Sequence, residues 1–184
     1  MKPSVLGLVE IRDLLRKLAE ELGGEWLLVG GALVAIWLDE RRVTEDLDLV
    51  GMRATSEERY RLLDCVGRLG LAVETVNSAA DYFVHRIPGW REQVEVLLRA
   101  GQSTIYRPTP TLFLLLKSAR LSERDLDDCR LMLARCARNG LALDVERVRA
   151  ALGDTRREES PGTGERHREL LHLLDDLCGS RSRT

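Results

Sequence analysis

Residues 27–50, LLVGGALVAIWLDERRVTEDLDLV, constrain the fold more than any other part of this sequence. An apolar run breaks at Gly30 and Gly31, resumes with a helical pattern, and ends in a second apolar run that contains Asp46 and Asp48. Because side chains alternate along a strand, both aspartates point to one face, while the leucines beside them point into a core. The segment therefore predicts a strand, a glycine turn, a short helix and a second strand.

The remainder of the chain indicates an α+β protein with a mixed N-terminal half and a helical C-terminal half. The character changes near the YRPTPT stretch, after which only helical periodicity remains. Helices are expected over residues 4–22 (capped by Ser4), 32–40, 56–69, 111–121, 123–138, 143–152 and 165–178, and strands over 25–30, 44–50, 71–76, 82–87 and 93–98. Residues 153–164 have the composition of a loop, and 179–184 that of a tail.

The overall composition excludes several classes of protein. The 184 residues carry 28 Lys and Arg against 30 Asp and Glu, so no global charge draws the chain to nucleic acid or membrane. The four cysteines form no CxxC pair and no zinc-type cluster. No apolar run reaches the roughly 18 residues that span a bilayer, and the N-terminus lacks the apolar core of a signal peptide. We therefore expect a cytoplasmic protein without a membrane partner.

The Asp-x-Asp pair and the glycine pair suggest one joint chemistry. Adjacent carboxylates repel each other and cost desolvation energy, and Mg²⁺ relieves this repulsion while bridging to phosphates. Taken alone, Asp-x-Asp is more often two solvated acids at a strand end, and Gly-Gly is often only a turn. Together, the glycines let backbone N–H groups approach a phosphate at a helix N-terminus, next to the carboxylates. Neither the P-loop pattern nor the Rossmann pattern is present.

The stretch VGGALVAIWLDERRVTEDLDLV resembles the core motif of minimal nucleotidyltransferases in the DNA polymerase beta-like nucleotidyltransferase superfamily. Arg42, Thr44, Asp46 and Asp48 fall on its R-x-T-x-D-h-D-h pattern without gaps, after the paired glycines. The resemblance implies a nucleotidyltransferase fold, with a catalytic core over residues 1–107. It also implies that the two aspartates hold two Mg²⁺ ions (or Mn²⁺), while the glycine pair, Arg42 and Thr44 bind the nucleotide.

The same resemblance calls for a third carboxylate on a later strand. Glu95, between two valines in EQVEVLL, is the first candidate for a catalytic and metal-binding residue. Glu92 is the fallback in a more polar stretch. The alternative is that Glu95 is an outward-facing residue on an edge strand.

The helical half, residues 108–184, carries a second resemblance. LLLKSARLSERDLDDCRLML resembles the K…R-D-x-x-D segment of nucleotidyltransferases related to the AbiEii-type toxins. Carried over, Lys117 would contact the triphosphate or its leaving pyrophosphate, and Asp125 and Asp128 would lie at the edge of the nucleotide-binding cleft. Arg124 would pair with these acids or with substrate; the alternative is a solvated helix face.

These resemblances, which cover about residues 25–135, imply a Mg²⁺-dependent nucleotidyltransferase. It would move a nucleoside monophosphate from a triphosphate such as ATP to a hydroxyl of RNA, tRNA, protein or a small molecule. The AbiEii-type resemblance adds a possible role as the toxin of a toxin–antitoxin pair, with an antitoxin as partner. The alternative is a catalytically decayed domain that binds nucleotide or a partner protein.

Overall fold

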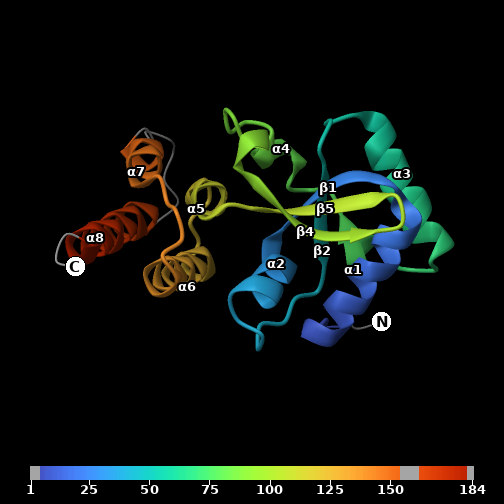
Figure 1. Cartoon of the computed structure of the whole chain (residues 1–184), viewed down its shortest axis with the longest axis horizontal. Helices are drawn as coiled ribbons and strands as arrows, with labels where there is room; N and C mark the ends of the chain where they lie inside the picture. The colour runs from blue at the N-terminus through green and yellow to red at the C-terminus, as the bar shows by residue number, and fades with distance from the viewer. Residues whose placement is uncertain (1–4, 154–161, 182–184) are drawn as a thin grey trace. The chain divides into compact units, whose positions relative to one another are not determined.

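The computed structural model describes residues 5–153 and 162–181, with side chains up to residue 177. The chain divides into two compact units, Met1–Pro108 and Thr109–Thr184, which are described separately. The N-terminal unit combines a sheet with helices, and the C-terminal unit is helical in its described part (Figure 1). This confirms the predicted α+β class.

The N-terminal unit is built on one mixed five-stranded sheet. Its strands are β1 (Gly24–Val29), β2 (Leu47–Gly51), β3 (Val76–Asn77), β4 (Val94–Ala100) and β5 (Ser103–Pro108). Their order in the sheet is β3-β2-β1-β5-β4. The pairs β1–β2 and β4–β5 are antiparallel, whereas β1–β5 and β2–β3 are parallel. The strand that carries Asp48 therefore lies between β1 and β3.

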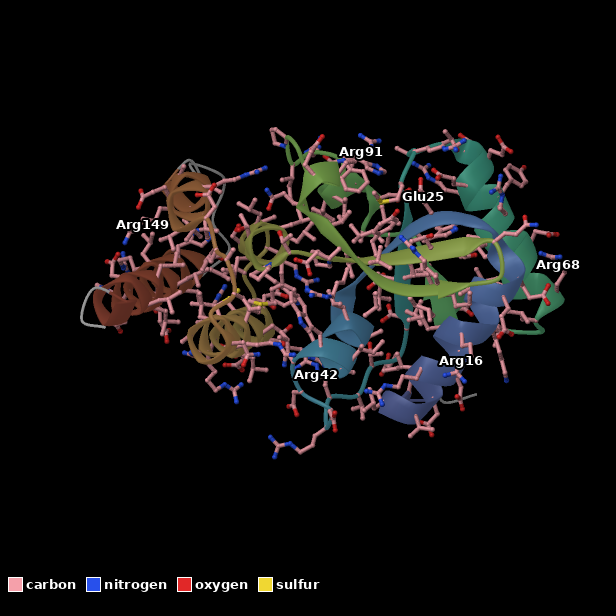
Figure 2. The ribbon with its side chains drawn as sticks, viewed as in Figure 1. Arg16, Glu25, Arg42, Arg68, Arg91 and Arg149 are labelled. Carbon is pink, nitrogen blue, oxygen red and sulfur yellow. The ribbon has the colours of Figure 1, made fainter. Side chains whose placement is uncertain are left out.

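The main helices of this unit are α1 (Leu8–Leu22), α2 (Gly30–Trp37) and α3 (Ser56–Arg68). The predicted start of α1 was too early, because the helix begins after Gly7, whose N–H donates to the Glu10 carboxylate at 3.1 Å. The proposed cap Ser4 lies outside the described residues. Helix α3 begins as predicted, with Thr55 accepting from the Glu58 N–H at 3.2 Å. Its last residue, Arg68, points away from the sheet (Figure 2).

The core of the unit confirms the alternation predicted for β2. Leu47 and Leu49 have no exposed surface, and Asp48 between them is half-buried on the other face. Helix α1 contributes a buried stripe in which apolar residues recur at three and four, while its charged residues stay exposed. The acidic face of β2 is thus separated from the main core by the thickness of the sheet.

Two predicted strands were wrong or shorter than expected. Residues 82–87 do not form a strand: the short helix α4 (Asp81–Val84) lies there, with Tyr82 and Phe83 exposed and Val84 buried. The stretch 71–76 is mostly a 3₁₀ turn, η1 (Val73–Thr75), and only its end pairs as β3. Both segments are short and apolar, and such runs do not distinguish strand from helix by periodicity.

The last strand of the sheet, β5, was missed. It runs directly into a proline-rich stretch, which the sequence reading took as the start of the helical half. A signal was present, because Gly101 and Gln102 form a two-residue turn between β4 and β5, with Gly101 at φ +53°. Such a turn joins neighbouring antiparallel strands.

The C-terminal unit contains α5 (Pro110–Ser118), α6 (Glu123–Asn139), α7 (Val145–Gly153) and α8 (Thr163–Arg181). Helices α5 and α6 start at side-chain caps on Thr109 and Ser122. Most of the loop expected over 153–164 falls outside the described residues, and α8 extends three residues into the expected tail. A search of the described helices found no membrane-spanning candidate.

Candidate active site

The aspartate pair lies at the start of β2, in the middle of the three strands β3, β2 and β1. Asp48 is opposite Val29 of β1 and opposite Asn77 of β3 in the hydrogen-bond register. Asp46 lies two residues earlier, just before the strand begins. Asn77, which pairs with Asp48, also donates to Asp46, so the two carboxylates lie near one another, and both side chains are only half-buried.

Two neutral side chains fix the carboxylate of Asp46. The Thr44 hydroxyl donates to Asp46 Oδ1 and the Asn77 amide donates to Asp46 Oδ2, both at 3.2 Å. Because neither donor carries charge, they orient the carboxylate and leave its negative charge for a ligand. Thr44, predicted to bind nucleotide, thus acts in the structure on Asp46. Asn77 was missed by sequence reasoning, since only the β2–β3 pairing brings it to the site.

The paired glycines lie against Asp48 and Thr44, at positions where a side chain would collide with them. Gly30 has φ +70°, and a Cβ on it would lie 2.1 Å from Asp48 Oδ2. A Cβ on Gly31 would lie 2.7 Å from Thr44 Oγ1. Both positions therefore need glycine so that Asp48 and Thr44 can approach the first turn of α2. The glycine turn and the aspartate-bearing segment of the sequence motif therefore pack directly against each other.

Replacing Gly30 with alanine is expected to damage both stability and activity. The positive φ and the contact with Asp48 should lower the free energy of unfolding by about 1–3 kcal/mol. Displacement of the carboxylate should lower the nucleotidyl transfer that the sequence resemblance implies by roughly 10²-fold. Urea unfolding and a transfer assay measure the two effects. The matched control is Gly67→Ala in α3, where a Cβ meets nothing within 4 Å. Equal stability of the two variants would contradict this explanation.

Arg42 lies between α2 and β2, in the loop that leads to Thr44 (Figure 2). Its backbone N–H donates to the Asp39 carbonyl at 2.9 Å, and its side chain is half-buried. Thr44 forms an isolated antiparallel bridge with Leu6, which ties this loop to the segment before α1. The loop that carries two of the predicted nucleotide-binding residues is therefore anchored at both ends.

Glu95 is not brought to the aspartate pair. Asp48 shares its sheet face with Tyr106, and Arg107, the next residue along β5, faces the opposite side. Glu95 pairs with Arg107 in the register and forms an ion pair with it, and the Arg107 guanidinium lies over the Trp37 ring at 4.1 Å. Glu95 therefore occupies the other face of an edge strand, as the alternative interpretation expected. Its fallback, Glu92, is exposed in the short turn η2 (Arg91–Gln93) before β4.

Neutralising Glu95 is accordingly expected to have little effect on catalysis. Glu95→Gln should leave transfer within about tenfold of the wild type, which corresponds to about 1.4 kcal/mol of barrier. The side chain is 50% exposed, so loss of its ion pair should cost less than about 1 kcal/mol of stability. Steady-state transfer rates provide the measurement. A loss as large as that for an Asp46 variant would place Glu95 in the site despite its orientation.

The donor set at the aspartate pair fits magnesium. In the described part of the chain, no three His, Cys, Asp or Glu side chains gather closely enough to enclose a metal ion. Mg²⁺ rarely needs such a cage, because it usually binds one or two carboxylates together with water and substrate phosphates. Asp46 and Asp48 offer this kind of open, hard-oxygen site, with Asp46 already held in orientation.

The predicted residues of the C-terminal unit form a buried ionic cluster. Lys117 Nζ lies 2.8 Å from Asp125 Oδ1 and 2.7 Å from Asp128 Oδ2. Asp125 also accepts from Arg120 and from the hydroxyl of Ser122, the cap of α6. Burial alone would raise the pKa of Asp125, but its bonds to Arg120 and Lys117 outweigh this and hold its pKa well below the usual range. The predicted shared face of Asp125 and Asp128 is therefore directed at Lys117.

The neighbouring residues of α6 are separate from this cluster. Asp127 is exposed and pairs with Arg130 on the helix surface, as the solvated-face interpretation expected. Arg124 is exposed one residue before Asp125. Cys129 is buried beside the cluster, and burial raises its pKa to about 12, so it is an unreactive core thiol.

The mixed sheet, its flanking helices and the glycine-linked carboxylate pair define a nucleotidyltransferase fold. A family model described as "Nucleotidyl transferase AbiEii toxin, Type IV TA system" matches residues 12–110. Because the match covers more than half of the chain, this protein belongs to the AbiEii nucleotidyl transferase toxin family. Comparisons with curated proteins and with solved structures gave no match. The matched stretch contains the glycine and aspartate pairs and ends before Lys117.

Proposed function

We propose that this protein is a metal-dependent nucleotidyltransferase that moves a nucleoside monophosphate from a triphosphate to a hydroxyl acceptor. The observation that carries the proposal is the pair Asp46 and Asp48, open on one sheet face and packed against the Gly30 turn. Thr44 and Asn77 orient Asp46 without neutralising it. Two accessible carboxylates close together, one of them held in orientation by neutral donors, are suited to a divalent cation.

Asp46 and Asp48 would hold magnesium, which when bound supplies Lewis-acid stabilisation of phosphate oxygens. The first turn of α2, beginning at Gly30, offers backbone N–H groups at a helix N-terminus for the triphosphate. The acceptor oxygen bonds to the α-phosphorus while the bond to the β-phosphate breaks. Pyrophosphate leaves with the electron pair, and the hydroxyl proton is released to solvent. Positioning and electrostatics carry the barrier reduction.

The remaining nucleotide-binding assignments rest on the sequence resemblance. Lys117 would contact the triphosphate or its leaving pyrophosphate, and Arg42 would help to neutralise that charge. Asp125 and Asp128 would hold Lys117 in place, in keeping with their bonds to its ammonium group. Glu95 is left out of the proposed site, because the register turns it away from Asp48.

The proposal is tested by incubating the protein with each α-labelled triphosphate, Mg²⁺, and either total RNA or cell lysate. Sensitivity of the labelled product to ribonuclease or protease then identifies the acceptor. The double variant Asp46→Asn/Asp48→Asn is the negative control. Absence of transfer and of binding for all four triphosphates would favour the decayed-domain alternative.

We further propose that transfer activity makes the protein a toxin with an antitoxin partner. The family to which the chain belongs is described as a toxin of a type IV toxin–antitoxin system. Induced expression in a bacterial host should arrest growth, and Asp46→Asn should relieve the arrest at equal protein level. Harmless expression of the wild type would count against this role.

A further inference from the structure

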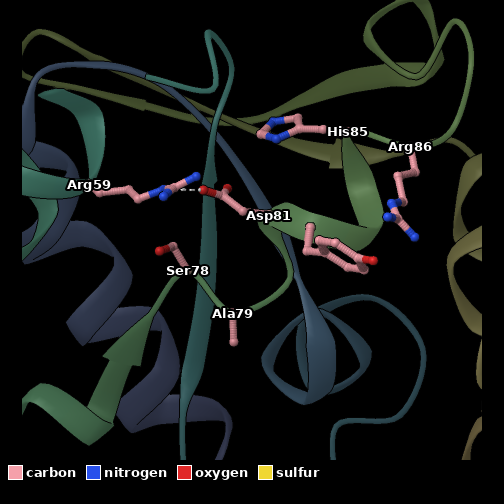
Figure 3. Close-up of a pocket in the computed structure, with 7 residues that line it drawn as sticks. Arg59, Ser78, Ala79, Asp81, His85 and Arg86 are labelled. Carbon is pink, nitrogen blue, oxygen red and sulfur yellow. Dashed lines mark hydrogen bonds and ion pairs between the residues drawn. The ribbon is translucent and has the colours of Figure 1, made fainter. Parts of the chain in front are cut away.

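A cavity lies around α4 in the N-terminal unit, and neither aspartate of the pair is among its lining residues. Its volume is about 570 Å³, and it is lined by Arg59, Ser78, Ala79, Asp81, Tyr82, His85 and Arg86. In Figure 3, Arg59 and Arg86 lie on opposite sides of Asp81, which is joined to Arg59 by an ion pair of 2.9 Å. The lining thus combines an aromatic ring, two arginines and two further titratable groups.

The cavity is connected to the aspartate pair through one residue. Asn77 donates to Asp46 through its amide nitrogen and accepts from the Ala79 N–H through its amide oxygen, at 3.0 Å. Ala79 and its neighbour Ser78 are part of the cavity wall. The cavity therefore adjoins the β3 side of β2, whereas the glycine turn follows β1 on the other side. Asp46 and Asp48 lie between them.

The cavity lining includes an exposed aromatic ring, Tyr82, with an arginine over it and the ring of Phe83 beside it. Tyr82 is 58% exposed, and the Arg86 guanidinium lies 3.8 Å from its ring centroid. Phe83, which is 49% exposed, meets the Tyr82 ring edge-on at 5.4 Å. Exposed aromatic rings and guanidinium planes of this kind are the surfaces on which proteins stack unpaired nucleobases. Arginine also supplies positive charge for the adjoining phosphates.

Two residues that line the cavity carry a buried polar atom without a hydrogen-bond partner among the described residues. Asp81 is only 7% exposed; its Oδ2 accepts from Arg59, but its Oδ1 has no hydrogen-bond partner among the described residues. The same holds for His85 Nε2, which is also buried. Buried polar atoms are nearly always hydrogen-bonded, so each of these two needs a partner, such as a water molecule or a group of a ligand that enters the cavity. A ribose hydroxyl or a base N–H is a suitable donor for Asp81.

We propose that this cavity is the subsite for an unpaired nucleotide of an RNA acceptor strand. The inference rests on the proposed transferase function, and it assigns a place on this chain to an RNA acceptor. In an in-line displacement the acceptor approaches opposite the leaving pyrophosphate. With the triphosphate at the glycine turn, the acceptor enters from the β3 side, where Tyr82 and Arg86 stack its base. Arg59 and Arg86 face its phosphates, and Asp81 accepts from its ribose or base.

The test is binding of a fluorescently labelled, single-stranded RNA oligonucleotide of mixed sequence to the full chain, read by anisotropy. Tyr82→Ala and Arg86→Ala should each weaken binding roughly 10-fold or more. Arg86→Ala should also reduce the slope of log affinity against log salt concentration, by the amount expected for the loss of about one phosphate contact. Tyr60→Ala is the matched control, because Tyr60 is an aromatic residue of α3 that is 78% exposed. It should bind RNA like the wild type.

The catalytic double variant Asp46→Asn/Asp48→Asn separates this inference from the proposed function. It should keep RNA binding while losing transfer, and excess free triphosphate should not displace the RNA. Failure of the wild type to bind RNA, wild-type affinity in Tyr82→Ala, or full displacement by triphosphate would each overturn the subsite. If RNA binding depends on Tyr82 but no transfer occurs with any triphosphate, the proposed function fails and the subsite stands.

Discussion

Replacing Asp46 or Asp48 with asparagine is expected to lower nucleotidyl transfer by roughly 10³-fold or more, without unfolding the protein. Several kcal/mol of transition-state stabilisation depend on the metal that these carboxylates would hold, and each 1.4 kcal/mol corresponds to about tenfold in rate. Stability should be kept or should rise slightly, since asparagine removes the repulsion between the two charges. Transfer rates and thermal unfolding of the same preparations measure the two properties.

Glu45→Gln provides the matched control for this loss. Glu45 is exposed and lies directly before Asp46, so its neutralisation changes the same net charge without touching the site. It should retain near-wild-type transfer. If Glu45→Gln and Asp46→Asn reduce transfer equally, a general charge effect rather than a metal site would explain the result.

Replacing Lys117 with methionine is expected to destabilise the C-terminal unit strongly, by about 3–5 kcal/mol. The side chains of Asp125 and Asp128 are 2% and 0% exposed, and Lys117 bonds to both. Removing the ammonium group leaves buried carboxylates without their shared counter-charge, although Asp125 keeps Arg120. Urea unfolding measures the loss. Any fall in the activity of this variant has to be corrected for the fraction of the protein that is folded.

A double variant and a surface control show whether the buried cluster causes this effect. Lys117→Met/Asp128→Leu should recover part of the stability, because the second change removes a buried carboxylate that has lost the Lys117 ammonium group. Asp127→Asn, on the exposed side of α6, should cost less than about 1 kcal/mol. If Lys117→Met were no more destabilising than Asp127→Asn, the cluster would not stabilise the unit.

The sequence predicted best the features that depend on neighbours along the chain. The strand, glycine turn, helix and second strand around Gly30 and Asp48 follow from local periodicity and from the conformational freedom of glycine. The start of α3 at Thr55 follows from a similarly local pattern, the capping box with Glu58. These elements fix the aspartate pair, so the centre of the candidate site could be anticipated.

Features that depend on strand pairing could not be anticipated in the same way. The face of Glu95 is set by its register with Arg107 on β5, a strand that was not among the predicted elements. Asn77 reaches Asp46 only because β3 pairs with β2. The α4 cavity requires Tyr82 on α4 and Arg86 in the turn after it to come together, whereas a strand was expected there. Pairing of distant segments carries little local signal in a single sequence.

The central claim is nucleotidyl transfer at Asp46 and Asp48, and parallel reactions with α-labelled and γ-labelled triphosphate test it most directly. In the presence of Mg²⁺, label from the α-phosphate should become attached to the acceptor, and label from the γ-phosphate should appear only in pyrophosphate. Chelation of the metal, or the Asp46→Asn/Asp48→Asn change, should abolish both the attachment of α-label and the release of labelled pyrophosphate. Transfer of γ-label to the acceptor, or equal transfer of α-label by the double variant, would contradict the account.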